Sequence, residues 1–179
     1  LNYYKSYTSE EGKTEEAFKL FELDDEYSEL FDLHHIVAEK DSKLKVVLDY
    51  TSCGSSEKFR NTVIKVLAKE NSEVEVFVIA RDDDKSLVLE SIGVYSEDHA
   101  KVSVHQYELG SARLYTNYKC ELIGEYSEGH VNSIYFGQKD EYINMNYDMI
   151  HKGKKTESDI LVNGALKGSS SKNFKSNLQ

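Results

Sequence analysis

The chain has 179 residues, a net charge of -10 at pH 7, no proline and 13 tyrosines. This length suits one domain that buries roughly 70% of the surface exposed by the unfolded chain. The missing proline excludes collagen-like and Pro-rich classes, and the acidic balance argues against nucleic acid as a partner. No apolar run approaches the roughly 20 residues of a membrane span and no leader opens the chain, so we expect a cytoplasmic protein that does not contact a membrane.

Short apolar segments recur along the chain with turn-like residues between them. Their centres fall roughly every 12 residues, the spacing of an all-β sandwich, barrel or solenoid rather than of a helical bundle. The segments are Phe18–Leu23, Leu33–Val37, Leu44–Tyr50, Val63–Ala68, Val74–Ala80, Leu87–Val94, Val102–Leu109, Leu114–Ile123, Val131–Phe136, Ile143–Ile150 and Ile160–Leu166.

The first part of the chain is the least regular. Residues 10–32 are strongly acidic, with only Lys13 and Lys19 to balance them, and a charged end is usually a solvated end. Asp24–Leu33 could form a short helix or a loop. We therefore expect residues 1–40 to form either the first coils or an N-terminal cap of a single domain that spans residues 1–179.

Alternation of apolar and polar residues predicts strands. Leu44–Tyr50 and Ile143–Ile150 each place every second, apolar side chain on one face, which is the pattern of a strand with one buried face. Leu114–Ile123 should likewise bury Leu114, Tyr118, Cys120 and Leu122. Val74–Ala80 is apolar on both faces and predicts a strand in the middle of the stack that is covered on both sides.

Residues 57–70 allow two interpretations. Phe59, Val63, Val66 and Leu67 have helical spacing, and Ser55 or Ser56 could cap such a helix. The β-branched pair at 63–64 and the regular spacing of the neighbouring segments favour a strand, which is our prediction.

The absence of hairpin signals favours a solenoid. Asn163-Gly164 is the one strong hairpin dipeptide, so an up-and-down barrel lacks its tight turns. We predict a parallel β-solenoid with two strands and about 24 residues per coil. The absence of proline agrees, because a central strand uses every N–H.

The last third of the chain resembles the SufB/SufD family of the SUF iron–sulfur cluster assembly machinery. The resemblance rests on Tyr142–Ile160, followed by Gly164-Ala165-Leu166 and by Ser171–Lys175, with weaker matches at Glu108-Leu109-Gly110, Glu121-Leu122-Ile123-Gly124, Ile134–Gly137 and Glu70-Asn71-Ser72. The phrases Thr156-x-Ser158-Asp159 and 164–166 are closer to SufD than to SufB.

The resemblance implies a right-handed parallel β-helix and a non-enzymatic scaffold. Such a scaffold works with a SufC-type ATPase and a SufB/SufD paralogue, and the full complex assembles the Fe–S cluster transiently. Family members carry a cluster-associated His or Cys after the region of 171–175, and helical regions at both ends, which we expect to lie outside this chain. We thus expect no cofactor bound here, and open strand edges could produce a homodimer.

His151 is the candidate for cofactor binding, because it lies in the best-matched motif and Asp159 could orient it. The alternative is a turn or stacking residue beside Gly153. Adjacent His34 and His35 should face opposite sides of a strand and cannot chelate one ion together. The other histidines, His99, His105 and His130, have no ligand spacing, so we expect no metal site.

The two cysteines and the acidic run also receive bland interpretations. Cys53 and Cys120 do not form a C-x-x-C pair, and we expect an exposed Cys53 and a buried Cys120 with a raised pKa. The run Asp82-Asp83-Asp84 predicts a solvated turn, since three consecutive carboxylates cannot converge on one ion. Gly110-Ser111 and Gly168–Ser171 lack the Gly-Lys-Ser/Thr ending of a phosphate loop, so we expect no ATP binding.

A second function class stays open. Parallel β-helices also host carbohydrate-active or carbohydrate-binding proteins, and the tyrosines and acidic residues of this chain suit them. A jelly-roll binding module is a third alternative, which rests on strand spacing alone.

Overall fold

The computed structural model describes all residues from 1 to 179 and contains thirteen β-strands and no helix. The strands are β1 (Tyr3–Ser9), β2 (Thr14–Leu23), β3 (Glu29–Ala38), β4 (Lys43–Ser52), β5 (Lys58–Ala68), β6 (Glu73–Arg81), β7 (Ser86–Ser96), β8 (Lys101–Glu108), β9 (Arg113–Leu122), β10 (Glu128–Gly137), β11 (Tyr142–His151), β12 (Glu157–Leu166) and β13 (Ser171–Leu178).

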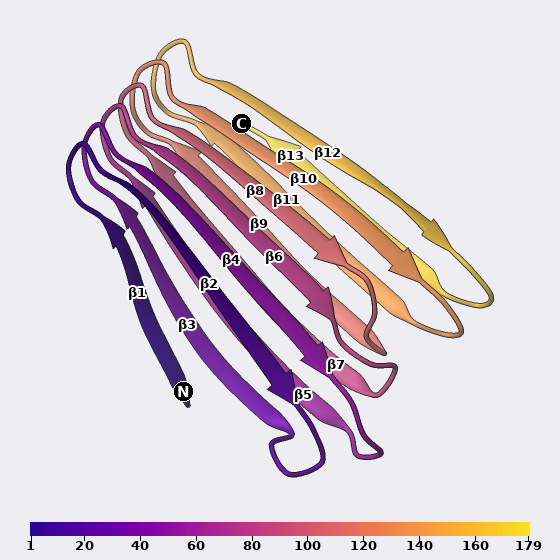
Figure 1. Ribbon diagram of the computed structural model, residues 1–179. Helices are drawn as coiled ribbons and strands as arrows, with labels where there is room; N and C mark the ends of the chain where they lie inside the picture. The colour runs from indigo at the N-terminus through magenta and orange to yellow at the C-terminus, as the bar shows by residue number, and fades with distance from the viewer.

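The strands form two sheets that the chain enters alternately. The odd-numbered strands make a seven-stranded sheet, sheet A, and the even-numbered strands make a six-stranded sheet, sheet B. Each strand pairs in parallel with the strands two before and two after it along the chain. Figure 1 shows the resulting stack of coils, from β1 at one end to β12 and β13 at the other. The prediction of an all-β parallel solenoid with two strands per coil is confirmed.

Each coil is longer than the predicted 24 residues. The register pairs Glu29 with Phe59 and Leu87 with Arg113, so one circuit takes 30 residues at the first place and 26 at the second. The spacing of apolar runs misses the charged residues at the strand ends, such as Lys43 and Lys101, which also belong to the ladders. A turn of four or five residues follows each strand.

Alternation decides which side chains lie inside. Leu114, Tyr118, Cys120 and Leu122 are at most 1% exposed, as predicted for β9. The inward residues of β4 and β11 are buried as well. The core is thus a continuous apolar interior between the two sheets.

Residues 57–70 contain a strand, β5, and no helix. Ile64, Val66 and Ala68 point inward, while Val63 and Leu67 lie on the outer face. The helical spacing was misleading because it joined residues from both faces of the strand. Ser55 and Ser56 do not cap a helix; both donate hydrogen bonds to Asp25 across the neighbouring turn.

Three other local expectations need correction. Asp24–Leu33 contains no helix, since a turn ends at Ser28 and β3 begins at Glu29. Asn163-Gly164 lies inside β12, where Gly164 lets the Tyr135 ring and backbone approach closely. β6 lies in the middle of sheet B as predicted, but Phe77 and Ile79 on its outer face are half-buried by neighbouring strands alone.

The turns form two edges of the solenoid. The first edge contains the turns that follow odd-numbered strands, and the second edge contains those that follow even-numbered strands. Each turn of the first edge places one residue in the left-handed region, with φ between 54° and 69°. These residues are Gly12, Asp41, Asn71, His99, Tyr126 and Lys155. Side-chain contacts join this column, including the His99 and Tyr126 rings, which stack at 5.1 Å.

Candidate functional site

A chain of hydrogen-bonded polar side chains runs through the middle of the apolar interior. In sheet A, the register stacks Asp32, Thr62, Glu90 and Thr116 on successive strands, all facing inward. Each is at most 1% exposed. Together with the residues that they contact, these side chains link β3 to β11, a distance of about 19 Å at the usual strand spacing. We call this set the interior polar chain.

The N-terminal part of the interior polar chain is centred on Asp32. Its carboxylate accepts hydrogen bonds from His34 Nε2 at 2.6 Å, from the Tyr50 hydroxyl at 2.7 Å and from Thr62 Oγ1 at 2.7 Å. Three donors satisfy the buried carboxylate, which would otherwise be costly to bury. The sequence placed His34 inside correctly, but not its bond to Asp32.

Arg60 occupies the centre of the interior polar chain. Its guanidinium donates to Asp82 Oδ2 at 2.9 Å, to Glu90 Oε2 at 3.3 Å and to Thr62 Oγ1 at 3.0 Å. It also packs on the Tyr50 ring at 4.1 Å. Burial alone would lower the pKa of Arg60, but the neighbouring carboxylates outweigh this effect and raise it. Arg60 is therefore a permanent positive charge inside the solenoid.

The C-terminal part of the interior polar chain is uncharged. Gln106 Nε2 donates to Glu90 Oε1 at 2.8 Å and to Thr116 Oγ1 at 3.0 Å, and Gln106 Oε1 accepts from the Tyr147 hydroxyl at 2.6 Å. Ser133 lies 2.7 Å from the same hydroxyl. Burial is the main reason that the pKa of Tyr147 is raised well above its ordinary value, so it remains a phenol.

The interior polar chain is closed to solvent and built from complementary donors and acceptors. It can hold charge and fix the register of the coils, but a substrate cannot reach it. No group of three or more His, Cys, Asp or Glu side chains in the structure is arranged to hold a metal ion. One signal could have revealed these residues: each polar side chain shares the parity of the apolar core residues on its strand.

His151, the cofactor-binding candidate, lies at the end of β11 and is half-buried. Its Nδ1 lies 2.6 Å from Thr156 Oγ1 and its Nε2 lies 2.9 Å from Ser158 Oγ. Asp159 does not orient it, because that carboxylate is bonded to His130 Nδ1 at 2.6 Å. Both ring nitrogens of His151 are occupied by hydroxyl groups of the following turn and strand.

The remaining histidines are dispersed over the solenoid. His34 and His35 lie on opposite faces of β3, as predicted. His99 and His105 stack on aromatic rings, the latter on Phe77 at 4.6 Å. His130 differs from expectation, since it contacts two carboxylates, Asp159 and Glu128.

The cysteines lie on different parts of the molecule. Cys53 is exposed in a turn of the second edge, whereas Cys120 is buried near the end of β9. Burial raises the pKa of Cys120 to about 11. The two thiols therefore cannot act on one ligand.

The acidic run 82–84 is a turn of the second edge, but it is not fully solvated. Asp84 is exposed and pairs with Lys139, whereas Asp82 is only 5% exposed and binds Arg60. The prediction of a solvated turn is wrong for Asp82. A buried arginine on β5 needs a carboxylate, and the turn after β6 supplies it.

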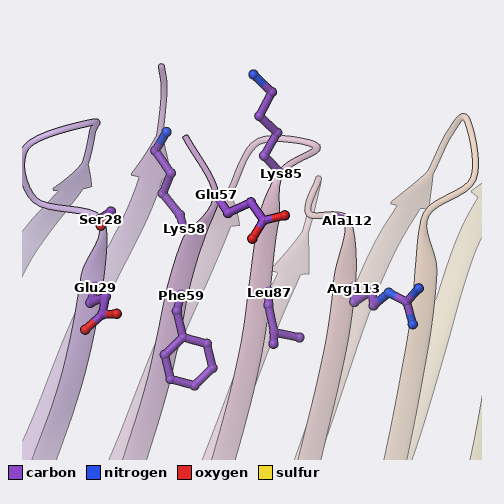
Figure 2. A pocket seen from close by; sticks show the side chains of 9 residues that line it. All are labelled: Ser28, Glu29, Glu57, Lys58, Phe59, Lys85, Leu87, Ala112 and Arg113. Carbon is purple, nitrogen blue, oxygen red and sulfur yellow. The ribbon is translucent and has the colours of Figure 1, made fainter. Parts of the chain in front are cut away.

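A groove of about 440 Å³ lies along the second edge, where β3, β5, β7 and β9 begin. Figure 2 shows Lys58 and Lys85 extending toward the turns, with Arg113 farther along the groove. The two lysines already bind turn residues: Lys58 Nζ donates to Asp25 at 3.0 Å, and Lys85 Nζ donates to the Ser55 carbonyl at 2.8 Å. Their role in the groove is to brace the turns.

Fold and interior thus define a two-sheet parallel β-solenoid with a charged core. Comparison with known families places it further: residues 21–179 match the model described as "SUF system FeS cluster assembly, SufBD core domain". The chain belongs to this family.

Individual relatives give the same result. The chain is 24% identical over 164 residues to proteins named "Iron-sulfur cluster assembly SufBD family protein ycf24" from Trieres chinensis, Pyropia yezoensis and Porphyra purpurea. Each alignment covers 87% of this chain and 34% of the relative. The chain therefore spans about a third of the length of these curated relatives. No helix in the structure has the length and hydropathy needed to span a membrane.

Proposed function

We propose that this chain is the solenoid core of a non-enzymatic scaffold subunit in iron–sulfur cluster assembly. The observation that carries the proposal is the match of residues 21–179 to the SufBD core domain. The cluster is cargo that the complex builds and passes on, and the solenoid holds the subunit in shape while this happens.

The placement of the titratable groups supports a scaffold rather than a catalyst. An enzyme needs an acid, a base or a nucleophile that substrate can reach. Here the most strongly perturbed groups, such as Glu108 and Tyr50, are at most 1% exposed. The accessible Cys53 has no histidine bonded to it, so nothing beside it activates the thiol.

The proposed partners are a SufC-type ATPase and a SufB/SufD paralogue. The outer face of sheet B supports a subunit that works in a complex, because large apolar side chains are exposed on it. They are Phe18, Leu20, Ile134, Phe136 and Leu161. The motifs at 156–159 and 164–166 favour a SufD-like member, which would pair with a SufB-type paralogue. We also propose that the protein acts in the cytoplasm.

Co-purification tests this function. The natural-length gene product that contains this chain is tagged and co-expressed with the SufC-type ATPase and, in separate arms, with a SufB-type or a SufD-type paralogue. We expect a stable complex with the ATPase and the SufB-type paralogue, which forms a cluster on anaerobic incubation with iron and sulfide. A gene product that binds neither protein refutes the proposal, and pairing with the SufD-type paralogue alone refutes the SufD-like assignment.

A further inference from the structure

The interior polar chain contains more negative than positive groups around Arg60. Three carboxyl groups share this part of the interior, from Asp82, Glu90 and Glu108, and all are between 1% and 5% exposed. Arg60 is the one cation among them. With every carboxyl ionised, the cluster would carry a net charge of -2 in a region without water access, which is a very costly arrangement.

Hydrogen bonds distinguish Glu108 from the other two carboxyl groups. Asp82 and Glu90 each accept a bond from Arg60, and Glu90 also accepts one from Gln106. Neither oxygen of Glu108 has a donor in the structure. The neighbour within bonding reach of Glu108 is the Glu90 carboxyl group. Two ionised carboxylates are both acceptors, so this contact forms a bond only when one of them carries a proton.

The other elements packed around Glu108 supply no second cation. On the adjacent strands of sheet B, its register partners are Ala80 and Tyr135. Across the interior lie Glu90 and Tyr147, whose hydroxyl is already bonded to Gln106. Asp82 approaches from the turn after β6. Apart from Arg60, the titratable groups that face Glu108 are therefore acids or phenols.

We infer that Glu108 takes up a proton when the chain folds and donates it in a hydrogen bond to the Glu90 carboxylate, so the core of the solenoid is a proton-binding site. The proton comes from solvent during folding and returns to solvent on unfolding. No other bond is made or broken. The inference does not depend on the proposed scaffold function, since it concerns the folded chain alone.

The direction of the pKa shift agrees with this geometry. Burial is the largest cause of the raised pKa of Glu108, and the negative charge of Glu90 raises it further. A carboxyl whose pKa is higher in the folded state binds more protons there than in the unfolded chain. Stability therefore falls as the pH rises above the unfolded pKa of Glu108, near 4.5, and continues to fall toward the folded pKa.

Thermal unfolding between pH 5 and pH 9 tests the inference on the whole chain. In Glu108→Gln, the amide N–H replaces the carboxyl proton as donor to Glu90 without titrating. We expect the melting temperature of this variant to exceed that of the wild type at pH 9 by at least about 3 °C more than it does at pH 5. Parallel pH profiles for the two proteins would overturn the inference.

Glu121→Gln is the matched control. Glu121 accepts hydrogen bonds from Lys119, at 2.7 Å, and from Lys152, which lower its pKa. Replacing it should cost more stability near pH 7 than near pH 4, the opposite trend to Glu108→Gln. If both variants shift the profile in the same direction, a general charge effect explains the result and the inference fails.

Infrared spectroscopy of the wild type gives a measurement that needs no folded variant. At pH 7 in heavy water, one buried protonated carboxyl group should absorb in the carboxylic acid region and disappear on unfolding. A spectrum in which every carboxyl group is ionised in the folded protein would refute the inference directly.

Discussion

Arg60 and Asp82 meet inside the solenoid, where Nη2 of the guanidinium donates to Oδ2 of the carboxylate at 2.9 Å. Arg60 lies on β5, in sheet A, and Asp82 follows β6, in sheet B. The bond therefore joins a strand to the turn that closes its own coil. It neutralises part of a charge that the apolar core could not otherwise accommodate.

Removing Arg60 should destabilise the chain strongly. We expect Arg60→Met to lose about 3–5 kcal/mol of unfolding free energy in urea, because buried carboxylates remain without their cation. Adding Asp82→Asn to this variant should recover part of the loss. The control is Arg81→Met, which breaks the half-exposed pair with Asp49 at 2.8 Å and should cost at most about 1 kcal/mol. Equal losses for the two arginine variants would show that burial does not decide the energy here.

Gly124 should tolerate no side chain. A Cβ at this position would lie 2.0 Å from the Asp98 backbone nitrogen of the turn below, so the two turns must separate. We expect Gly124→Ala to cost about 1–3 kcal/mol in urea unfolding. Gly93→Ala is the control on β7: its Cβ meets nothing within 4 Å, so the change should be neutral or stabilise by about 0.5–1 kcal/mol. Equal costs at both positions would contradict the close approach of the turns.

The cysteines should differ in reactivity under native conditions. We expect a disulfide reagent to modify Cys53 at least about ten times faster than Cys120, because Cys120 is buried and its pKa of about 11 leaves little thiolate at pH 8. In denaturant the two rates should become similar, which serves as the internal control. Similar rates in the folded protein would mean that β9 opens readily.

This chain alone should neither retain an Fe–S cluster nor hydrolyse ATP. A cluster needs several thiolates or equivalent ligands converging on iron, whereas Cys53 and Cys120 lie on different parts of the solenoid and His151 is bonded to Thr156 and Ser158. Anaerobic reconstitution with iron and sulfide, followed by absorbance and iron analysis, measures retention, and phosphate release measures hydrolysis. The natural-length protein with its partners is the control. A stoichiometric cluster on the isolated chain would contradict the expectation.

Sequence patterns predicted the fold well because strand alternation is a local property. Apolar residues at every second position, such as Leu44 and Leu48 on β4, placed the core correctly. The circuit length was wrong because the ladders extend beyond the apolar residues into charged positions such as Lys43. A better signal was available in the turns, where Asp41, Asn71 and His99 recur at intervals of 30 and 28 residues.

The interior site was harder to predict because it violates the pattern that defines the fold. On β5, Arg60 is inside while Val63 is outside, so hydrophobicity alone assigns this strand poorly. The partners of Arg60 come from the turn after β6 and from β7, and only the register of the coils brings them together. The side-chain bonds of His151 likewise could not be read from its neighbours in the motif.

The left-handed column of the first edge shows that the repeat of this protein is encoded in backbone conformation rather than in residue identity. The equivalent position is glycine in one coil, tyrosine in another and lysine in a third, yet φ stays between 54° and 69°. A search for recurring letters therefore finds little, although the coils are geometrically interchangeable at this edge. Coils joined at such a position are modular units, which could be duplicated or exchanged without redesigning the turn. The interior polar chain sets the limit, because a coil carrying Arg60 must keep the neighbour that carries Glu90.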